Sequence, residues 1–203
     1  MIKIVDYGLG NVLAFHNVYK RLNVPVGIAT TAADVAEASK LILPGVGAFD
    51  HAMALLDGSG MRGALDSAVL KRRVPVLGIC VGMQILARGS EEGTASGLGW
   101  VPGRVRNLRS AQPESLPLPH MGWNDVQPAT GSKLFAGLEV GAQFYFLHSF
   151  FMQCDDPSDI AAVATYGFEF CCAVNVGNVY GVQFHPEKSH HFGRQLLKNF
   201  AEL

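Results

Sequence analysis

Short apolar segments alternate with helical patterns in the first half of the sequence, and this alternation constrains the fold more than any other feature. Strand-like runs at residues 2–6, 24–29, 40–45 and 74–79 are each followed by a stretch with helical periodicity. Short β-rich runs separated by helices form βαβ units, whose strands lie parallel and whose helices cover both faces of the sheet. We therefore expect a three-layer α/β fold with a mostly parallel central sheet.

From about residue 99 the pattern changes to successive strand candidates, until a final helix is predicted over residues 189–200. Such a run is typical of antiparallel strands added at one side of a parallel sheet. The result would be a flavodoxin-like sheet with antiparallel additions. The strand candidates are 100–108, 119–127, 142–151, 160–167, 170–176 and 178–185.

Composition limits the class of protein. The chain has 203 residues, 49% of them hydrophobic, and a net charge of -1, so we expect one domain over residues 1–203 with a large core. Its few, balanced charges exclude the basic surface of a nucleic-acid binder and a polybasic membrane anchor. The longest uncharged stretch, about 140–154, contains polar residues and is too short for a membrane span.

The start of the sequence reads as a buried strand and a turn, without the pattern of a signal peptide, so we expect a cytoplasmic protein. In that compartment free thiols are the default. Cys154, Cys171 and Cys172 are expected to be small buried hydrophobic residues, and the adjacent pair 171–172 is expected to point to opposite sides of a strand.

One cysteine stands apart, because Cys80 lies between Gly78 and Gly82 at the end of an apolar run. This spacing is that of a strand-to-helix elbow, where the flanking positions come too close together for side chains and the nucleophile is exposed. A helix N-terminus at this point favours a thiolate and can donate to an oxyanion. The alternative is a tight turn with a buried cysteine and no catalytic role.

A thiolate nucleophile needs a proton shuttle, and the segment VQFHPEKS at 182–189 offers one. In an extended strand His185 and Glu187 share one face, so the carboxylate can orient the imidazole toward the thiol. Pro186 keeps His185 out of the helical region. Taken alone, this segment is better explained as a surface turn after an edge strand.

A third segment, LILPGVGAF at 41–49, runs from a strand into a glycine-rich loop. Gly45 and Gly47 leave backbone N–H groups that can approach a ligand, as an oxyanion hole requires, although an ordinary glycine turn has the same composition. Because the carboxyl ends of parallel strands meet at one sheet edge, the three segments are expected to converge there.

Together these motifs resemble the class I, or triad, glutamine amidotransferases, whose marks are PGxG, GxCxGxQ and HPE in this order. Within that class the whole chain is similar to the glutaminase subunits of imidazole glycerol phosphate synthase. The segments that carry this resemblance are DYGLGN, PGVGAFD, GICVGMQIL, HMGWN, FYFLHSF and QFHPEKS. Departures are modest: Val81 stands where many relatives have Leu, and the FCC and HH pairs are unusual.

The resemblance implies a catalytic role for three residues. Cys80 would attack the side-chain amide of L-glutamine, His185 would take and return a proton, and Glu187 would orient His185. The N–H of Val81 and an N–H of the Val46–Gly47 peptide would hold the oxyanion.

By the same resemblance, Gln84 would contact the bound glutamine, and Gly47 with the backbone of Ser149 and Phe150 would hold its amino and carboxylate groups. A polar helix residue near the surface is the alternative for Gln84. For His148, a structural role is expected.

The resemblance also implies a partner, the cyclase subunit, which is a (β/α)8 barrel that uses the released ammonia in histidine biosynthesis. Asn11, Trp123, Tyr145 and Lys188 match interface positions in the family, and the expected assembly is a heterodimer. For Trp123 the alternative is a core aromatic residue. No cofactor is implied.

Other motifs in the sequence suggest alternative sites and functions. The GLG at 8–10 suggests a dinucleotide site, but Leu13 occupies the third glycine position. His190 and His191 add imidazoles beside HPEKS, but the spacing of a zinc site is missing, so no metal is expected. A peptidase, an amidotransferase of another pathway, and a catalytically silent binding subunit remain as alternatives.

Overall fold

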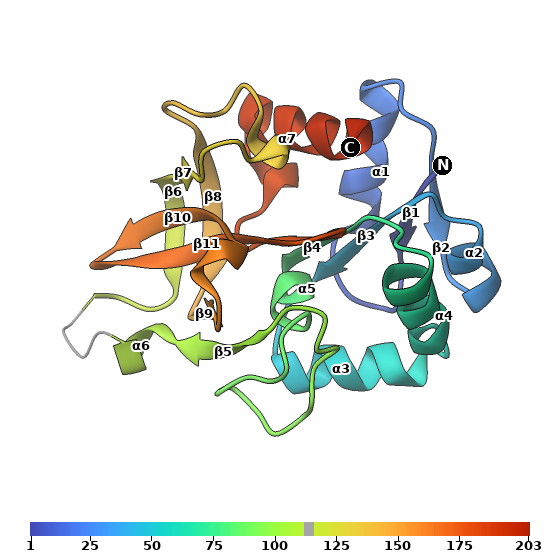
Figure 1. Cartoon of the computed structure of the whole chain (residues 1–203), viewed down its shortest axis with the longest axis horizontal. Coiled ribbons are helices and arrows are strands. Elements are labelled where there is room, and N and C mark those ends of the chain that lie inside the picture. Colours follow the sequence, from blue (N-terminus) through green and yellow to red (C-terminus); the bar gives the residue numbers. More distant parts are fainter. Residues whose placement is uncertain (112–115) are drawn as a thin grey trace.

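A ten-stranded sheet runs through the middle of the computed structural model, which describes residues 1–111 and 116–203 (Figure 1). Its main path follows the order β2-β1-β3-β4-β12-β11-β10-β7, and neighbouring strands are parallel from β2 to β12. The parallel strands are β1 (Ile2–Val5), β2 (Val26–Ala29), β3 (Lys40–Gly45), β4 (Val76–Cys80) and β12 (Val179–Val182).

The remaining strands of this sheet are antiparallel to their neighbours, as predicted for additions at one side. They are β11 (Phe168–Val176), β10 (Ile160–Tyr166), β7 (Gln127–Pro128), β9 (Phe150–Cys154) and β5 (Gly103–Asn107). Two further strands, β6 (His120–Asp125) and β8 (Gln143–His148), pair with each other in a separate two-stranded ribbon.

Helices cover both faces of the sheet. In Figure 1, α1 (Val12–Arg21) and α7 (His190–Glu202) lie on one face, and α3 (Phe49–Gly58), α4 (Arg62–Asp66) and α5 (Val81–Gln84) lie on the other. α2 (Ala32–Ala36) packs against α4, and α6 (Leu108–Ala111) follows β5. The short helical turns are η1 (Ser67–Lys71), η2 (Lys133–Phe135), η3 (Pro157–Asp159) and η4 (Pro186–Lys188).

Local chemistry explains where the first helices begin. The side chain of Asn11 accepts a hydrogen bond from the N–H of Ala14 at 3.1 Å and so caps α1. Thr31 and Asp34 form a reciprocal capping box at the start of α2. Such caps satisfy N–H groups that have no partner within the helix.

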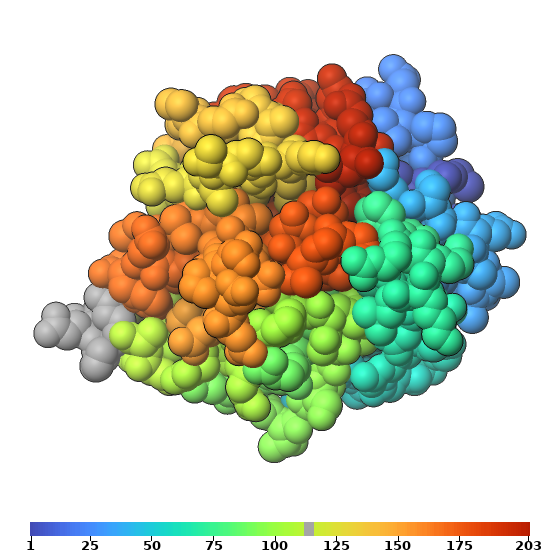
Figure 2. Space-filling view, in the orientation of Figure 1, coloured from blue at the N-terminus to red at the C-terminus, as the bar shows by residue number. Residues whose placement is uncertain are grey.

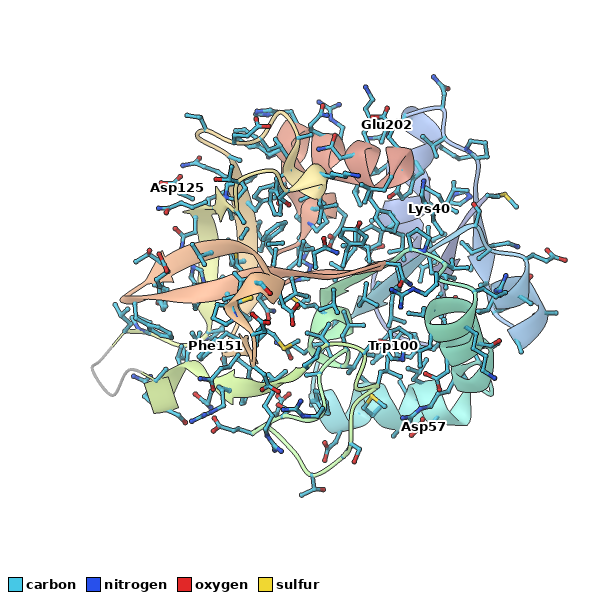
Figure 3. The ribbon with its side chains drawn as sticks, viewed as in Figure 1. Lys40, Asp57, Trp100, Asp125, Phe151 and Glu202 are labelled. Atoms are coloured by element: carbon cyan, nitrogen blue, oxygen red, sulfur yellow. The ribbon has the colours of Figure 1, made fainter. Side chains whose placement is uncertain are left out.

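The core fills the space on both sides of the sheet. All residues of β1 and β4 are buried, as expected for central strands covered on both faces. Figure 2 shows the C-terminal segment against the N-terminal one, and the Tyr19 hydroxyl of α1 donates to the Leu197 carbonyl oxygen of α7 at 3.2 Å. Figure 3 shows side chains packed between the sheet and its helices, with Asp57 and Glu202 at the periphery.

Three details differ from the sequence predictions. The candidate strand 119–127 is divided into β6 and β7, and 142–151 is divided into β8 and β9, because the chain leaves the main sheet and returns to it. β12 is not an antiparallel addition, since it pairs parallel with β4 in the middle of the sheet. Cys154, which was expected to be buried, is only partly buried at the end of β9, whereas Cys171 and Cys172 are buried as predicted.

Candidate active site

Cys80 ends β4 and occupies a sharp turn before α5. Its backbone has φ 56° and ψ -115°, a combination that few residues other than glycine adopt. A side chain at Gly78 would lie 2.5 Å from the carbonyl oxygen of Gly82, and one at Gly82 would overlap the carbonyl oxygen of Leu43. The two glycines are therefore required by close backbone approach, as the elbow prediction states.

His185 and Glu187 form a hydrogen-bonded pair beside Cys80. The Nδ1 atom of His185 lies 2.9 Å from Oε1 of Glu187, and both side chains are almost fully buried. The sequence analysis predicted both residues on one extended strand, and this detail is wrong. Instead β12 ends at Val182, and the turn η4 brings the carboxylate back under the imidazole.

The charge state of His185 is coupled to that of Cys80. Burial by itself lowers the pKa of His185, but hydrogen bonds to Cys80 and Glu187, with the charges of both groups, outweigh it and raise the pKa to about 9. The arrangement therefore favours a protonated imidazole of His185 next to the sulfur of Cys80.

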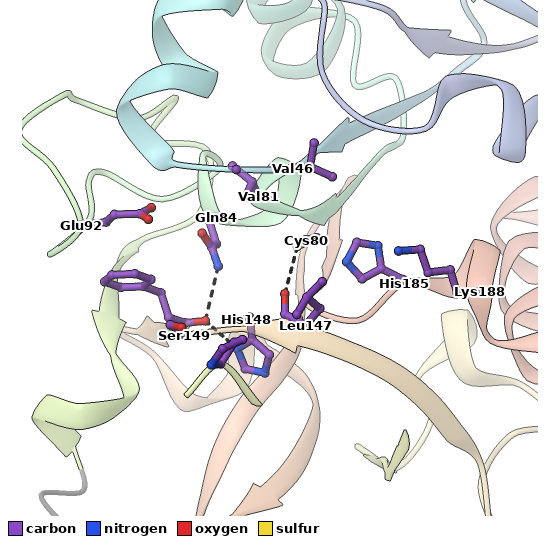
Figure 4. Close-up of a pocket in the computed structure, with 13 residues that line it drawn as sticks. Val46, Cys80, Val81, Gln84, Glu92, Leu147, His148, Ser149, His185 and Lys188 are labelled. Carbon is purple, nitrogen blue, oxygen red and sulfur yellow. Dashed lines mark hydrogen bonds between the residues drawn. The ribbon is translucent and has the colours of Figure 1, made fainter. Parts of the chain in front are cut away.

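A cavity of about 270 Å³ opens over the sulfur of Cys80 (Figure 4). Every residue predicted from the resemblance to hold the substrate or the oxyanion lines it together with Cys80 and His185. These residues are Val46, Gly47, Val81, Gln84, Ser149 and Phe150. Lys188, which was predicted at a partner interface, also lies at this cavity.

The region predicted to bind the oxyanion combines two backbone segments. Val81 is the first residue of α5, where N–H groups have no acceptor within the helix. Gly47 has φ 86° in the loop after β3, and the neighbouring Val46 is 43% exposed. These segments can place N–H groups on one side of a carbonyl oxygen bound over Cys80.

Gln84 lies one helical turn after Cys80 and is buried, so the alternative of a surface helix residue is wrong. Its Nε2 atom donates to the carbonyl oxygen of Phe150 at 3.4 Å and to Oε1 of Gln183 at 3.0 Å. Both amide hydrogens are therefore used, and Oε1 of Gln84 is the atom left to accept from a ligand.

His148 is buried, lines the cavity and belongs to a chain of polar groups. Its Nδ1 atom lies 2.7 Å from the carbonyl oxygen of Phe150, which can only accept, so His148 donates there. Its Nε2 atom then accepts from Nδ1 of His120 at 2.9 Å. Burial lowers the pKa of His148 to about 3 and that of His120 to about 4, so both are neutral. This bonding agrees with the structural role expected for His148.

Glu92 lines the cavity, although the sequence analysis did not identify it. Its Oε2 atom accepts from the N–H of Phe49 at the start of α3 at 2.8 Å. The same loop is held by Asp50, which accepts from the N–H groups of Thr94 at 2.9 Å and Ala95 at 3.0 Å. Nothing in the spacing of this loop distinguishes Glu92 from its neighbour Glu91, so only the structure could find it.

The predicted interface residues gather on one exposed side of the site, with one exception. Trp123 is 46% exposed and stacks on His190 with ring centroids 5.3 Å apart, so it is not a core aromatic residue. The Nζ atom of Lys188 lies 5.7 Å from the ring centroid of Tyr145, opposite Trp123 in the ribbon. Asn11 is the exception, since it borders a smaller cavity on the far side of His185.

The described residues limit other kinds of site. Among them no helix has the length and apolar character that crossing a bilayer needs. Nor does the described part of the chain gather three or more His, Cys, Asp or Glu side chains as a metal site would.

The sequence matches the model of the family Glutamine amidotransferase class-I over residues 3–203, and the fold and site agree with this class. The chain belongs to this family. Three relatives specify the resemblance further, and all are imidazole glycerol phosphate synthase subunits HisH. The protein of Bdellovibrio bacteriovorus is 65% identical over 204 residues, that of Leptospira interrogans is 51% identical over 204, and the HisH 2 of Pseudomonas aeruginosa is 44% identical over 203. Each match covers 100% of both chains.

Solved structures share the fold at lower identity. A glutamine amidotransferase crystal structure has a TM-score of 0.74 and 18% identity, covering 100% of this chain and 99% of the other. PurLQS from Thermotoga maritima has a TM-score of 0.72 and 16% identity, covering 99% and 97%.

Proposed function

We propose that this chain is the glutaminase subunit of an imidazole glycerol phosphate synthase, and that residues 1–203 act as one amidotransferase domain. Membership of the amidotransferase family supports the reaction, and full-length identity of 65% to a HisH protein supports the pathway. The observation that carries the proposal is the position of Cys80, which sits on a strained elbow beside the buried His185–Glu187 pair.

Catalysis starts when the Cys80 thiolate attacks the side-chain amide carbon of glutamine. The oxyanion that forms is held by the N–H of Val81 and by an N–H near Gly47, at about 3–4 kcal/mol for each donor. His185 gives its proton to the nitrogen, ammonia leaves, and a thioester remains on Cys80. His185 then takes a proton from water, which attacks the thioester and releases glutamate, while Glu187 stabilises the imidazolium.

The polar groups around the cavity match the two ends of glutamine. The carboxylate of Glu92 suits the α-ammonium group, and N–H groups of Ser149 and Phe150 suit the α-carboxylate. Oε1 of Gln84 accepts from an N–H group of the substrate, since its own amide hydrogens are already used. Charge and hydrogen-bond direction therefore favour glutamine over an acid of the same length.

The ammonia is delivered to a cyclase subunit, a (β/α)8 barrel bound as a heterodimer. Trp123, Tyr145 and Lys188 form a partly exposed aromatic and basic surface beside the cavity, and such side chains are common anchors in interfaces. Asn11, the fourth predicted interface residue, borders a separate small cavity that His185 also lines. Ammonia that passes through a closed interface escapes protonation by bulk water. We place this activity in the cytoplasm, where its four free cysteines remain reduced.

The test is glutamate release from glutamine, measured for this chain alone and for this chain with its cyclase subunit and the ribotide ligand. Strong release is expected in the loaded complex, and Cys80→Ala is expected to abolish it. Cys154→Ala is the matched control, because this cysteine is partly buried at the end of β9, outside the residues that line the cavity. Absence of glutamate release in every mixture would contradict the proposal and favour a binding subunit.

A further inference from the structure

Gln183 has no role in the mechanism above, yet its side chain lies against the nucleophile. It follows directly after β12 and is completely buried. Its Nε2 atom lies 3.8 Å from Sγ of Cys80, within the range of an N–H donor to sulfur. Its backbone N–H donates to the carbonyl oxygen of Cys172 at 2.8 Å, which fixes the chain at this point.

Hydrogen-bond direction decides which end of the Gln183 amide faces the sulfur. The carbonyl oxygen of Phe150 can only accept, so the group of Gln84 beside it must be the NH2 group. The same NH2 group donates to Gln183, which must therefore present Oε1 to Gln84 at 3.0 Å. The NH2 group of Gln183 is left facing Cys80.

The other groups around the sulfur of Cys80 show why a thiolate at this position needs an additional donor. The carbonyl oxygen of Leu147 lies 4.0 Å from Sγ of Cys80 and can accept from a thiol, but it repels a thiolate. On the ionised sulfur, His185 provides one donor. The NH2 group of Gln183 provides a second donor, from the buried side of the site.

We propose that Gln183 is a further catalytic residue, whose side-chain N–H donates to the Cys80 thiolate, and that Gln84 is the positioning residue that holds this amide in the donating orientation. This inference rests on the proposed function, because it assumes that the Cys80 thiolate is the nucleophile. It adds a second role to Gln84, whose NH2 group serves Gln183 while its Oε1 atom serves the substrate.

A donor of this kind changes the pH at which the sulfur becomes reactive. A hydrogen bond to the charged form favours that form, and loss of one such bond is expected to move the reactivity midpoint up by about one pH unit. Thiolate nucleophilicity rises with basicity at a Brønsted slope of about 0.4–0.5. This gain offsets part of the roughly tenfold lower thiolate fraction, so the net loss of rate below the midpoint is about threefold.

The experiment measures alkylation of Cys80 by iodoacetamide against pH, in the full chain, with mass spectrometry of the peptide that contains Cys80. This readout excludes Cys154, which is partly exposed. It needs neither glutamine turnover nor the cyclase subunit, so it can fail while the proposed function holds. Gln183→Met keeps the length of the side chain and loses the donor without adding a charge, and Gln183→Leu loses the donor in a shorter apolar side chain.

Both Gln183 variants are expected to raise the alkylation midpoint by about one pH unit and to slow alkylation below it by about threefold. Gln84→Met is expected to move the midpoint in the same direction by less, because the Gln183 amide is then free to turn. Gln84→Met leaves Gln183 in place, so this variant still tests the proposal if the Gln183 variants do not fold.

The matched control is Asn199→Met. Asn199 is another buried amide, and it donates to the carbonyl oxygens of Leu134 at 3.0 Å and Ala136 at 2.8 Å, among residues that do not line the cavity. Its loss is expected to lower stability and leave the alkylation midpoint unchanged. An unchanged midpoint in folded Gln183→Met and in Gln84→Met would overturn the proposal, as would an equal shift in Asn199→Met.

Discussion

At the scale of single residues, the proposed nucleophile, Cys80, occupies a backbone conformation that costs stability. A residue other than glycine in a sparsely populated region loses about 1–3 kcal/mol, which the surrounding structure must offset. At Cys80 the offset comes from its position between two buried elements, β4 and α5. Catalytic geometry and stability therefore oppose each other at this position.

The strain predicts an unusual order of stability for two inactive variants. Cys80→Gly is expected to be more stable than Cys80→Ala by about 1 kcal/mol, although glycine normally lowers stability relative to alanine, because only glycine adopts a positive φ freely. Urea unfolding of both variants measures the difference. The control pair is Ser67→Gly and Ser67→Ala in η1, where φ is -63° and alanine should be the more stable.

Glu187 is expected to act on the charge of His185 more than on its position. Glu187→Gln retains an oxygen that can accept from His185 Nδ1 but loses the negative charge, which is one of the causes that raise the pKa of His185. We expect glutamate release to fall by about 10²–10⁴-fold, by analogy with loss of the charge in a serine triad. Glu139→Gln, on a surface loop, serves as control. Full activity of Glu187→Gln would show that the charge is not needed.

Residues of the site were predictable where the sequence itself brings them together. Gly78, Cys80 and Gly82 are close along the chain, and their spacing describes one turn. The pairing of His185 with Glu187 was predicted from the alternation of side chains along a strand. The structure forms the pair through the turn η4 instead.

Glu92 and Gln183 were not predicted, and the reason is physical. The first lies in a loop whose position depends on contacts with α3, and the second is defined by a neighbour on a different element. Neither dependence leaves a local pattern in the sequence.

At the scale of elements, the loop that carries Glu92 depends on α3 for its position. Asp50 accepts two backbone N–H groups of this loop, and these bonds hold the pKa of its carboxyl below the usual value. Asp50→Ala is expected to raise KM for glutamine several-fold with less effect on kcat, because Glu92 loses its fixed position. Steady-state kinetics of the complex measures both constants.

The control for this prediction lies on the same helix. Asp57 pairs with Arg62 at 2.6 Å on the surface, at the other end of α3. Asp57→Ala is expected to leave KM unchanged, since exposed ion pairs contribute about 0–1 kcal/mol and this one is remote from the cavity. Equal KM values for Asp50→Ala and the unaltered chain would contradict the supporting role of the loop.

The ribbon of β6 and β8 predicts how stability depends on pH. Its buried residues His120 and His148 are neutral in the fold, because burial lowers the pKa to about 4 and about 3 from 6.5. Below pH 6.5 the unfolded chain takes up protons that the folded chain does not, so stability is lost as the pH falls from 6.5 toward about 4. Unfolding by urea at a series of pH values measures this.

A variant of His120 tests whether this histidine causes the loss of stability at low pH. In His120→Asn the loss of stability between pH 6.5 and about 4 is expected to be smaller than in the unaltered chain, although the variant starts from a lower stability. The exposed His51 on α3 provides the comparison, since His51→Asn should leave the pH dependence unchanged. An identical pH dependence in all three proteins would contradict the assignment.

The elements themselves were largely predictable, because strand and helix periods are local properties. The ribbon was not, since the alternation of β6 and β8 is the same whether they join the main sheet or leave it. The strand pattern alone grouped β12 with the antiparallel additions, because pairing partners depend on the whole chain. Only the expected convergence of the three motifs indicated its parallel pairing with β4.

At the scale of the whole molecule, the proposed complex depends on the exposed surface around Trp123. Trp123→Ala is expected to weaken binding of the cyclase subunit by about 1–2 kcal/mol or more, because a large aromatic anchor is lost. Isothermal titration calorimetry measures the change. Val140→Ala is the control, since Val140 is 93% exposed on a turn outside this surface. Unchanged affinity of the Trp123 variant would place the interface elsewhere.

The position of β12 has a consequence for the order in which the protein folds during synthesis. Along the chain it is the last strand, but in space it lies in the middle, between β4 and β11. During synthesis the two halves of the sheet therefore emerge before the strand that joins them, and His185 and Glu187 emerge later still. A ribosome-bound chain carries the proposed nucleophile, Cys80, long before it carries the proposed base, His185, so we expect no glutamine to be consumed until the sheet has closed.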